Sequence, residues 1–270
     1  MNHSEPKKEV YEFWNDASCG ESLYLSSETR EGFAAQLKKR YELEPFIPEF
    51  AKFNQSKGLK VLEIGVGLGA DHQMFAEAGA QLYGIDLTDR AIEHTRNRLA
   101  CFQLQSVLNV GDAENLSFQN ESFDLVYSWG VLHHSPQTPK AIRECWRVLK
   151  AGGVARIMVY HTWSMVGLML WLRYGLLRGR PFVGMKEIYS KYLESPGTKA
   201  YSFAEAKELF KDFSEVNIRT VMTHADLLES DVGQRYRGTV LSLARKVWPR
   251  WLIRSLFPNA GLFMLIEARK

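Results

Sequence analysis

Residues Lys60 to Thr88 read KVLEIGVGLGADHQMFAEAGAQLYGIDLT, and the rest of the chain can be interpreted outward from them. A short apolar run ends at a turn in which positions 65, 67 and 69 are glycine, so backbone can approach a ligand where a Cβ would collide. Apolar residues at helical spacing follow until Gly79, which can end a helix in the left-handed conformation. A second apolar run ends at Asp86, roughly 20 residues beyond the first glycine. This pattern predicts a strand, a binding turn, a helix and a second strand.

The glycine turn alone does not identify a ligand, because several classes of cofactor-binding protein use one. A dinucleotide-binding turn would place its third glycine at position 70, which is alanine, and the turn lacks the Gly-Lys-Ser/Thr of a phosphate loop. The carboxylate of Asp86 can accept two hydrogen bonds from a ribose diol. A plain tight turn and a nicotinamide oxidoreductase stay open as alternatives.

Three motifs together resemble one family. Glu63-Ile64-Gly65-Val66-Gly67-Leu68-Gly69 resembles the first motif of the class I S-adenosylmethionine-dependent methyltransferases. The run 143–153, RECWRVLKAGG, resembles that family's third motif, with Ala151 where proline is more usual. The run 129–134, WGVLHH, resembles the subgroup that methylates small molecules such as quinone precursors (ubiquinone/menaquinone-methyltransferase-like), sterols and polyketide-type metabolites. The resemblance implies S-adenosyl-L-methionine as the cofactor.

The remaining apolar periods agree with the fold that this resemblance implies. Strands are expected at 106–110, 122–129, 155–159, 213–221 and 261–268, and helices at 89–99, 138–149 and 203–210. The expectation is a single α/β domain over 1–270, with a Rossmann-like, seven-stranded, mostly parallel sheet, an antiparallel last strand and helices on both faces. Residues 8–55 are expected to form an N-terminal lid, and insertions at 161–202 and 224–258 a cap around the acceptor.

The expected cofactor site lies at the carboxyl ends of the parallel strands, where such sheets bind ligands. The resemblance implies that Asp112 and the Ala113 amide meet adenine, and that Ser128, Trp129 and His133 lie beside the methionine part. In the lid, aromatic side chains could cover the cofactor or only the sheet, and Arg40 could reach the cofactor carboxylate or cap its helix. The candidate cofactor-binding residues are Tyr11, Trp14, Arg40, Glu63, Gly65, Gly67, Gly69, Asp86, Leu87, Asp112, Ala113, Ser128, Trp129 and His133.

Methyl transfer from a sulfonium is a one-step displacement that needs no metal ion, and positioning accounts for much of the rate. A hydroxyl acceptor needs a base, whereas a carboxylate acceptor does not. His133 and His161 follow strands that end at the cleft, and with Tyr160 they are the candidate catalytic residues. We expect O-methylation of a small molecule. The alternatives are a lipid, isoprenoid or peptide carboxylate, a carbon or nitrogen centre, and a cofactor binder without transferase activity.

Composition limits the possible partners. A net charge of +3 over 270 residues gives no global case for a nucleic-acid partner. Three scattered cysteines without CxxC spacing suggest reduced thiols and a cytoplasmic chain. The most apolar segment, 163–172, is too short to span a bilayer, but the basic amphipathic run 241–256 could be a packing face or make peripheral membrane contact. The sequence leaves the oligomeric state open.

Overall fold

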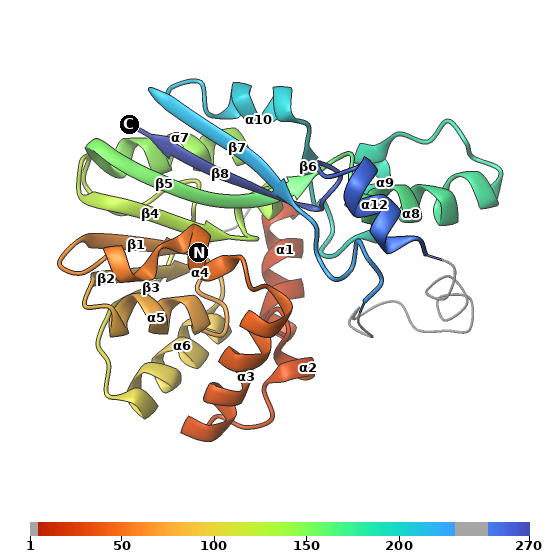
Figure 1. Cartoon of the computed structure of the whole chain (residues 1–270). Helices are drawn as coiled ribbons and strands as arrows, with labels where there is room; N and C mark the ends of the chain where they lie inside the picture. Colours follow the sequence, from red (N-terminus) through yellow and green to blue (C-terminus); the bar gives the residue numbers. More distant parts are fainter. Residues whose placement is uncertain (1–4, 230–247) are drawn as a thin grey trace.

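The computed structural model describes residues 5–229 and 248–270, which form one sheet flanked by helices (Figure 1). The strands are β1 Lys60–Ile64, β2 Gln81–Asp86, β3 Val107–Val110, β4 Phe123–Trp129, β5 Leu149–His161, β6 Ala200–Tyr201, β7 Glu215–Val221 and β8 Phe263–Arg269. The α-helices are α1 Glu5–Asp16, α2 Glu21–Tyr24, α3 Arg30–Leu43, α4 Ile47–Ala51, α5 Ala70–Glu77, α6 Asp89–Phe102, α7 Thr138–Val148, α8 Met165–Tyr174, α9 Met185–Tyr192, α10 Phe203–Leu209 and α12 Arg250–Leu256. Short 3₁₀ turns are η1 Phe53–Gln55, η2 Leu132–His134 and η3 Leu176–Arg178.

The sheet follows the order β3-β2-β1-β4-β5-β8-β7. β8 runs antiparallel to both of its neighbours, and the other pairings are parallel. The expected mostly parallel sheet with an antiparallel last strand is therefore confirmed. The expected number of strands is wrong: the described residues contain eight, because the two residues of β6 pair with the end of β5. Sequence periodicity cannot detect a strand of two residues, since it contains no period.

The two faces of the sheet form separate apolar cores because successive strand residues point to opposite sides. In β5, Ile157 and Val159 pack in the core beneath α7 and α10. Met158 and Tyr160 pack in the other core, with side chains from α4 and α5. The helices expected at 89–99, 138–149 and 203–210 are all present, with ends within three residues of the expectation.

The two insertions and the N-terminal segment lie around the carboxyl ends of the parallel strands. α8, η3 and α9 form the first insertion, and α12 belongs to the second (Figure 1). Met165 of α8, Leu227 and Ile253 of α12 form a small apolar cluster that joins the two insertions. In the predicted membrane-contact run 241–256, residues 241–247 lie outside the described residues. Across 5–229 and 248–270, the structure has no helix that is long and apolar enough to cross a membrane.

Candidate cofactor and acceptor site

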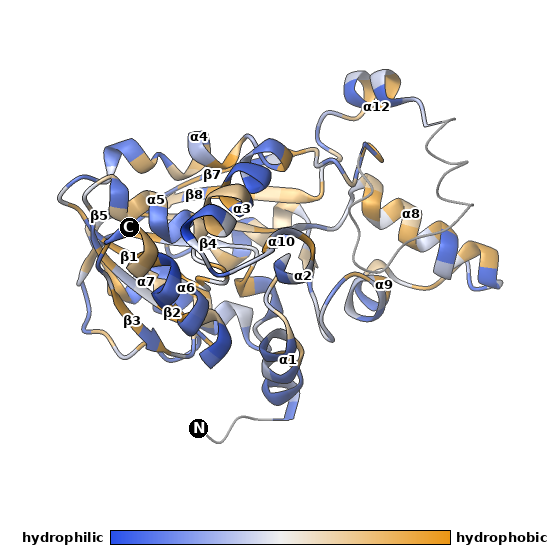
Figure 2. Cartoon of the chain, turned by 90° about the horizontal axis from the view of Figure 1, so that it is seen from below, coloured by the Kyte–Doolittle hydropathy of each residue, from blue (hydrophilic) through white to orange (hydrophobic). Residues whose placement is uncertain are grey.

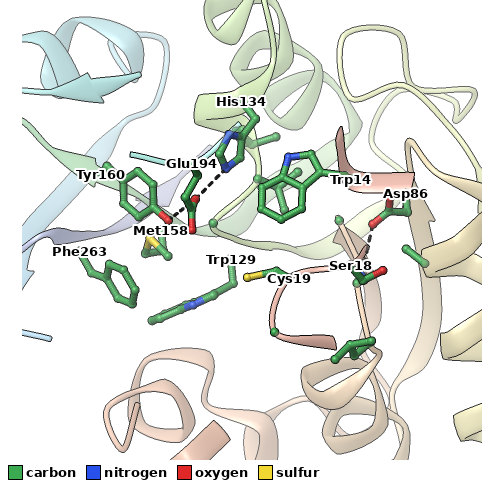
Figure 3. Close-up of a pocket in the computed structure, with 18 of the residues that line it drawn as sticks. Trp14, Ser18, Cys19, Asp86, Trp129, His134, Met158, Tyr160, Glu194 and Phe263 are labelled. Atoms are coloured by element: carbon green, nitrogen blue, oxygen red, sulfur yellow. Dashed lines mark hydrogen bonds and ion pairs between the residues drawn. The ribbon is translucent and has the colours of Figure 1, made fainter. Parts of the chain in front are cut away.

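One cavity of about 540 Å³ lies at the carboxyl ends of β1, β2, β4 and β5. Its volume falls within the range of small-molecule sites. α1, α2 and α3 contribute one wall, and α8 and the segment after α9 contribute another (Figure 3). The cavity therefore has a half formed by the glycine turn and a half formed by the insertions, which we call the cofactor half and the acceptor half.

The glycine turn forms the floor of the cofactor half. Gly65 and Gly67 have φ of +84° and +51°, in the left-handed region that side chains disfavour. A Cβ on Gly65 would lie 2.1 Å from Val131 Cγ2, whereas a Cβ on Gly67 would enter open space. Both residues line the cavity. Gly69 does not line it, contrary to the prediction, because it precedes α5 and packs against Thr95.

Asp86 ends β2 and lines the cavity beside this turn. Its Oδ2 accepts a hydrogen bond from the Gly67 amide at 3.2 Å, and its Oδ1 accepts from the amide and hydroxyl of Thr88 at 3.0 and 2.9 Å. Burial raises the pKa of the Asp86 carboxyl. These hydrogen bonds fix the orientation of both carboxylate oxygens before any ligand binds. Such a fixed carboxylate suits the ribose-binding role that the sequence predicts. Leu87, also a predicted contact, lines the cavity next to it.

Asp71 is a buried carboxylate that the sequence analysis did not identify, although it lies one residue into α5. Arg40 donates to both of its oxygens at 2.9 and 2.8 Å, and the hydroxyls of Tyr41 and Tyr127 donate at 3.0 and 2.8 Å. Burial would raise the pKa of Asp71, but these donors outweigh it and hold the pKa below its usual value. Arg40 thus lines the cavity, as predicted, while it is engaged in an ion pair.

Glu63 is the acid of the first motif and lies at the cavity wall. Its Oε2 is 2.8 Å from Nδ1 of His72, whose Nε2 is 2.8 Å from the Ser106 hydroxyl. Burial raises the pKa of Glu63 well above its usual range and lowers the pKa of His72 to about 3. The contact is therefore a hydrogen bond between a carboxyl and a neutral imidazole. It fixes Glu63 against α5.

Asp112, the predicted adenine contact, lines the cavity with Ala113 and is already engaged. Lys7 of α1 places its ammonium 2.6 Å from Asp112 Oδ2 and 2.7 Å from Glu114 Oε2. Burial lowers the pKa of Lys7, but the two carboxylates outweigh it and raise the pKa overall. This arrangement, which we call the Lys7 clasp, attaches α1 across the end of β3. No sequence motif indicates it, because the partners lie 105 and 107 positions away.

The N-terminal aromatic residues differ in whether they line the cavity. Trp14 lines the cavity, and its ring meets the ring of His134 edge-on with centroids 5.2 Å apart. Tyr11 does not line it and instead donates to Asp89 at 3.1 Å on the outer surface, so its cofactor contact stays a prediction. Ser128 is likewise outside the lining, because its hydroxyl donates to the Ile64 carbonyl at 2.9 Å inside the sheet.

The acceptor half combines apolar side chains with one polar cluster (Figure 3). The cluster is formed by Tyr160 at the end of β5, His134 from η2, and Glu194 from the segment after α9. The Tyr160 hydroxyl donates to Glu194 Oε2 at 2.7 Å, and His134 Nε2 lies 3.4 Å from the same oxygen. The apolar residues of this half include Met158, Leu170, Leu193, Leu228, Leu262 and Phe263.

His134 is oriented from behind by two hydroxyl groups. Its Nδ1 lies 2.8 Å from Ser195 Oγ and 3.1 Å from Thr198 Oγ1, so Nε2 points toward Glu194 and the cavity. Among the described residues, His133, His134 and Glu194 also offer ligand atoms within 4.8 Å of one another that could hold a metal ion. The prediction that the reaction needs no metal therefore requires its own test.

Two predicted catalytic histidines are not at the cavity surface. His133 is fully buried, its ring tilted by 34° against that of Tyr160 with the centroids 4.0 Å apart, and His161 is buried with Nδ1 3.3 Å from the Gly261 carbonyl. Neither lines the cavity, and a catalytic role for either residue stays a prediction. Burial lowers the pKa of each imidazole. The sequence contains two adjacent histidines, and the backbone of η2 decides that the second one faces the cavity.

The charge of the cofactor half suits a cationic ligand better than a pyrophosphate. Asp86 places a carboxyl group beside the glycine turn, whereas Glu63 is hydrogen-bonded to His72 and Asp71 is paired with Arg40. A pyrophosphate would meet the Asp86 carboxyl there, whereas a sulfonium carries the opposite charge. The open space beside Gly67 also leaves room for a ligand against the backbone. The residues present therefore fit S-adenosyl-L-methionine.

Comparisons with known proteins agree with this geometry. Residues 62–157 match the protein family described as "Methyltransferase domain". The phthiotriol/phenolphthiotriol dimycocerosates methyltransferase of Mycobacterium leprae is 39% identical over 98 residues, which cover 36% of this chain and 36% of that protein. The ubiquinone biosynthesis O-methyltransferase of Coxiella burnetii is 30% identical over 97 residues, covering 36% and 42%.

A solved structure extends the likeness over most of the chain. The crystal structure of an S-adenosylmethionine-dependent methyltransferase from Mesorhizobium loti matches with a TM-score of 0.55 and 18% identity, covering 83% of this chain and 97% of that one. Residues 62–157 therefore resemble a methyltransferase domain, and the chain shares its Rossmann-like fold with the Mesorhizobium loti structure. It spans about half or less of the length of the curated relatives it matches.

Proposed function

We propose that this chain transfers a methyl group from S-adenosyl-L-methionine to a hydroxyl group of a small, largely apolar acceptor. The observation that carries the proposal is one continuous cavity with a glycine turn and acidic groups in one half, and the Tyr160-Glu194-His134 cluster among apolar residues in the other. When bound, the cofactor supplies a methyl group made electrophilic by the adjacent sulfonium. A small-molecule acceptor agrees with the cavity volume of about 540 Å³, part of which the cofactor would fill.

The cofactor-binding roles follow from position in the cofactor half. Asp86 would accept hydrogen bonds from the ribose hydroxyls, because its carboxylate is oriented by the turn and by Thr88. Asp112 and the Ala113 amide would meet the adenine ring. Trp129 and Gly65 would lie along the methionine part, since both line the cavity where β1 and β4 end. These contacts orient the methyl group toward the acceptor half.

A hydroxyl acceptor must lose a proton as its oxygen forms the new bond to carbon. We assign this proton to His134 Nε2, which points into the cavity next to Glu194. With the cofactor bound, its methyl group would pass from sulfur to the acceptor oxygen to give an ether and S-adenosylhomocysteine, and the proton would leave through His134 to solvent. Glu194 would stabilise the imidazolium that forms, and Tyr160 would orient Glu194 through its 2.7 Å hydrogen bond.

A lipid or isoprenoid acceptor is the second candidate, and it is favoured by the apolar lining of the acceptor half. The Mycobacterium leprae relative is named for a lipid acceptor, which supports this reading without fixing it. Methylation of a peptide carboxylate would not need a base, so loss of the His134 imidazole would leave that reaction fast. A carbon or nitrogen centre must also lose a proton, so the identity of the labelled product distinguishes those acceptors from a hydroxyl. A nicotinamide oxidoreductase or a silent cofactor binder predicts no methyl transfer at all.

The proposal is tested in two steps with the full chain. Calorimetric titration with S-adenosylhomocysteine and, separately, NAD should give saturable binding of the first ligand only. A labelled-methyl assay over phenols, aliphatic alcohols, carboxylates, amines and lipid extracts should then label a hydroxyl compound. Binding of NAD alone would overturn the cofactor assignment. Binding of S-adenosylhomocysteine with label transferred only to amines or carboxylates would overturn the hydroxyl assignment.

A further inference from the structure

The tip of the first insertion exposes seven consecutive residues, Leu176 to Phe182, with the sequence LLRGRPF. Leu177 and Phe182 are 81% and 99% exposed, the highest fractions among the large apolar side chains of the described residues. The segment between α8 and α9, which includes these residues, lies at the far end of α8, away from the sheet (Figure 1). Large apolar side chains held this far out of the protein normally mark an interaction site. We call residues 176–182 the cap tip.

The charge around the cap tip is unlike that of the remaining chain. Residues 163–192 contain five basic side chains and one acidic side chain, a net charge of +4, while the whole chain carries +3. All other residues together therefore carry a net charge of −1. Arg178 and Arg180 lie within the cap tip, with Arg178 over the Tyr174 ring at 4.9 Å and Arg180 paired to Glu187 at 2.9 Å. Positive charge and exposed apolar surface thus coincide in one place.

The same helix that leads to the cap tip also lines the acceptor half. Val166, Met169, Leu170 and Arg173 of α8 line the cavity, and Arg173 is exposed, so the cavity reaches the protein surface along this helix. The opposite side of α8 exposes Leu168. Figure 2 shows α8 as a largely apolar helix that projects from the body of the molecule. An apolar molecule could therefore pass from a surface touching the cap tip into the acceptor half.

We infer that the cap tip docks on an anionic lipid bilayer and delivers an apolar acceptor along α8. Leu177 and Phe182 would enter the boundary between headgroups and acyl chains, and Arg178 and Arg180 would contact the anionic headgroups. We favour a bilayer over a protein partner because exposed apolar side chains and two arginines share one short protruding loop, a combination typical of membrane-surface segments. The docking site differs from the predicted run 241–256, of which 248–256 are described: Ile253 is buried, Trp248 is half-buried and donates to the Asp226 carbonyl, and Trp251 is exposed.

Vesicle co-sedimentation of the full chain, without cofactor, tests the inference. Vesicles of phosphatidylcholine with about one third phosphatidylglycerol should bind the wild type, whereas pure phosphatidylcholine vesicles should bind it at least fivefold more weakly. Leu177→Ser/Phe182→Ser should weaken binding about tenfold or more, because the lost contacts are apolar. Arg178→Ser/Arg180→Ser should weaken it by about fivefold per arginine at low salt, and less at high salt.

Val107→Ser is the matched control, since Val107 is also an exposed apolar residue, 49% exposed, but lies on the edge strand β3. It should bind vesicles as the wild type does. Circular dichroism and thermal unfolding should show that all variants stay folded, because the substituted side chains are exposed. Absence of wild-type binding to anionic vesicles, or equal binding by the Leu177→Ser/Phe182→Ser variant, would overturn the inference.

The wild type could elute as a dimer in size-exclusion chromatography while the Leu177→Ser/Phe182→Ser variant elutes as a monomer. That result would assign the cap tip to self-association and would overturn the membrane-docking inference. Binding of S-adenosylhomocysteine by the same variants separates this inference from the proposed function. That affinity should be unchanged, so loss of vesicle binding with intact cofactor binding supports the docking site. If the wild type binds no S-adenosylhomocysteine, the proposed function is contradicted, but the docking inference is not.

Discussion

The two halves of the cavity are built in different ways. In the cofactor half, polar groups are fixed before any ligand arrives: Asp86 is held by the Gly67 amide and Thr88, and Asp71 by Arg40 and two phenols. In the acceptor half, apolar side chains from separate segments surround one small polar cluster. A preformed polar site costs little reorganisation when a charged ligand binds. An apolar site accepts several shapes, which suits variation in the acceptor.

The sharpest test of the rigid half is Gly65→Ala. The new Cβ would be strained at φ +84° and would lie 2.1 Å from Val131 Cγ2, so the turn must move. We expect affinity for S-adenosylhomocysteine, measured by calorimetry, to fall roughly 10³-fold. Gly152→Ala is the control, because it has a similar φ of +76° and open space around its Cβ. Similar affinity in both variants would show that the close approach of backbone at Gly65 does not matter.

The polar cluster of the acceptor half is tested by His134→Ala. Loss of the proposed proton acceptor should lower turnover about 10²-fold while affinity for S-adenosylhomocysteine holds. His161→Ala is the control, and we expect it to keep near-normal turnover because His161 lies outside the cavity. A chelator added to the wild type should leave turnover unchanged if the cluster binds no metal ion. Loss of turnover in the control but not in His134→Ala would restore the original assignment of His161.

The Lys7 clasp connects the lid to the rigid half, and Lys7→Met should loosen it. Removal of the ammonium leaves Glu114 bonded to Ser135 and the Gln137 amide, but frees α1 from β3. Hydrogen exchange of the α1 amides should become about tenfold faster, because a partly buried ion pair with two acceptors is lost. Lys8→Met is the control, since Lys8 has only an exposed contact with Glu12 at 3.8 Å. Equal protection in both variants would show that the clasp does not hold α1.

The smallest expected effect concerns Glu44, which lines the cavity near Arg40. Burial raises the pKa of its carboxyl to about 7, from a usual value of about 4.3 in an unfolded chain. Ionisation is therefore disfavoured in the folded state, and this group's contribution to stability is lost as pH rises from about 4.5 through 7. Chemical unfolding of Glu44→Gln should show a gain over the wild type that grows by ~1 kcal/mol between pH 5 and pH 6. A constant difference across that range would contradict the shifted pKa.

Much of the cofactor half could be predicted from sequence because its signals are local. Glycines at fixed spacing, an acid at the end of the next strand and the apolar periods between them all act within about 30 residues. The acceptor half could not be predicted in the same way. Glu194 lies in an insertion with no periodic pattern, and it meets His134 only because the segment after α9 returns to the sheet. The choice between His133 and His134 depends on one 3₁₀ turn.

The network around Asp71 also defines where the chain can be shortened. Arg40 and Tyr41 come from α3, so deletion through residue 43 would leave an interior carboxylate with a single phenol donor, a severe defect in a dry core. Deletion through residue 26 removes α1 and α2 but keeps all three donors. A shortened chain that begins just ahead of Thr29 therefore keeps the Asp71 network, although it loses the Lys7 clasp.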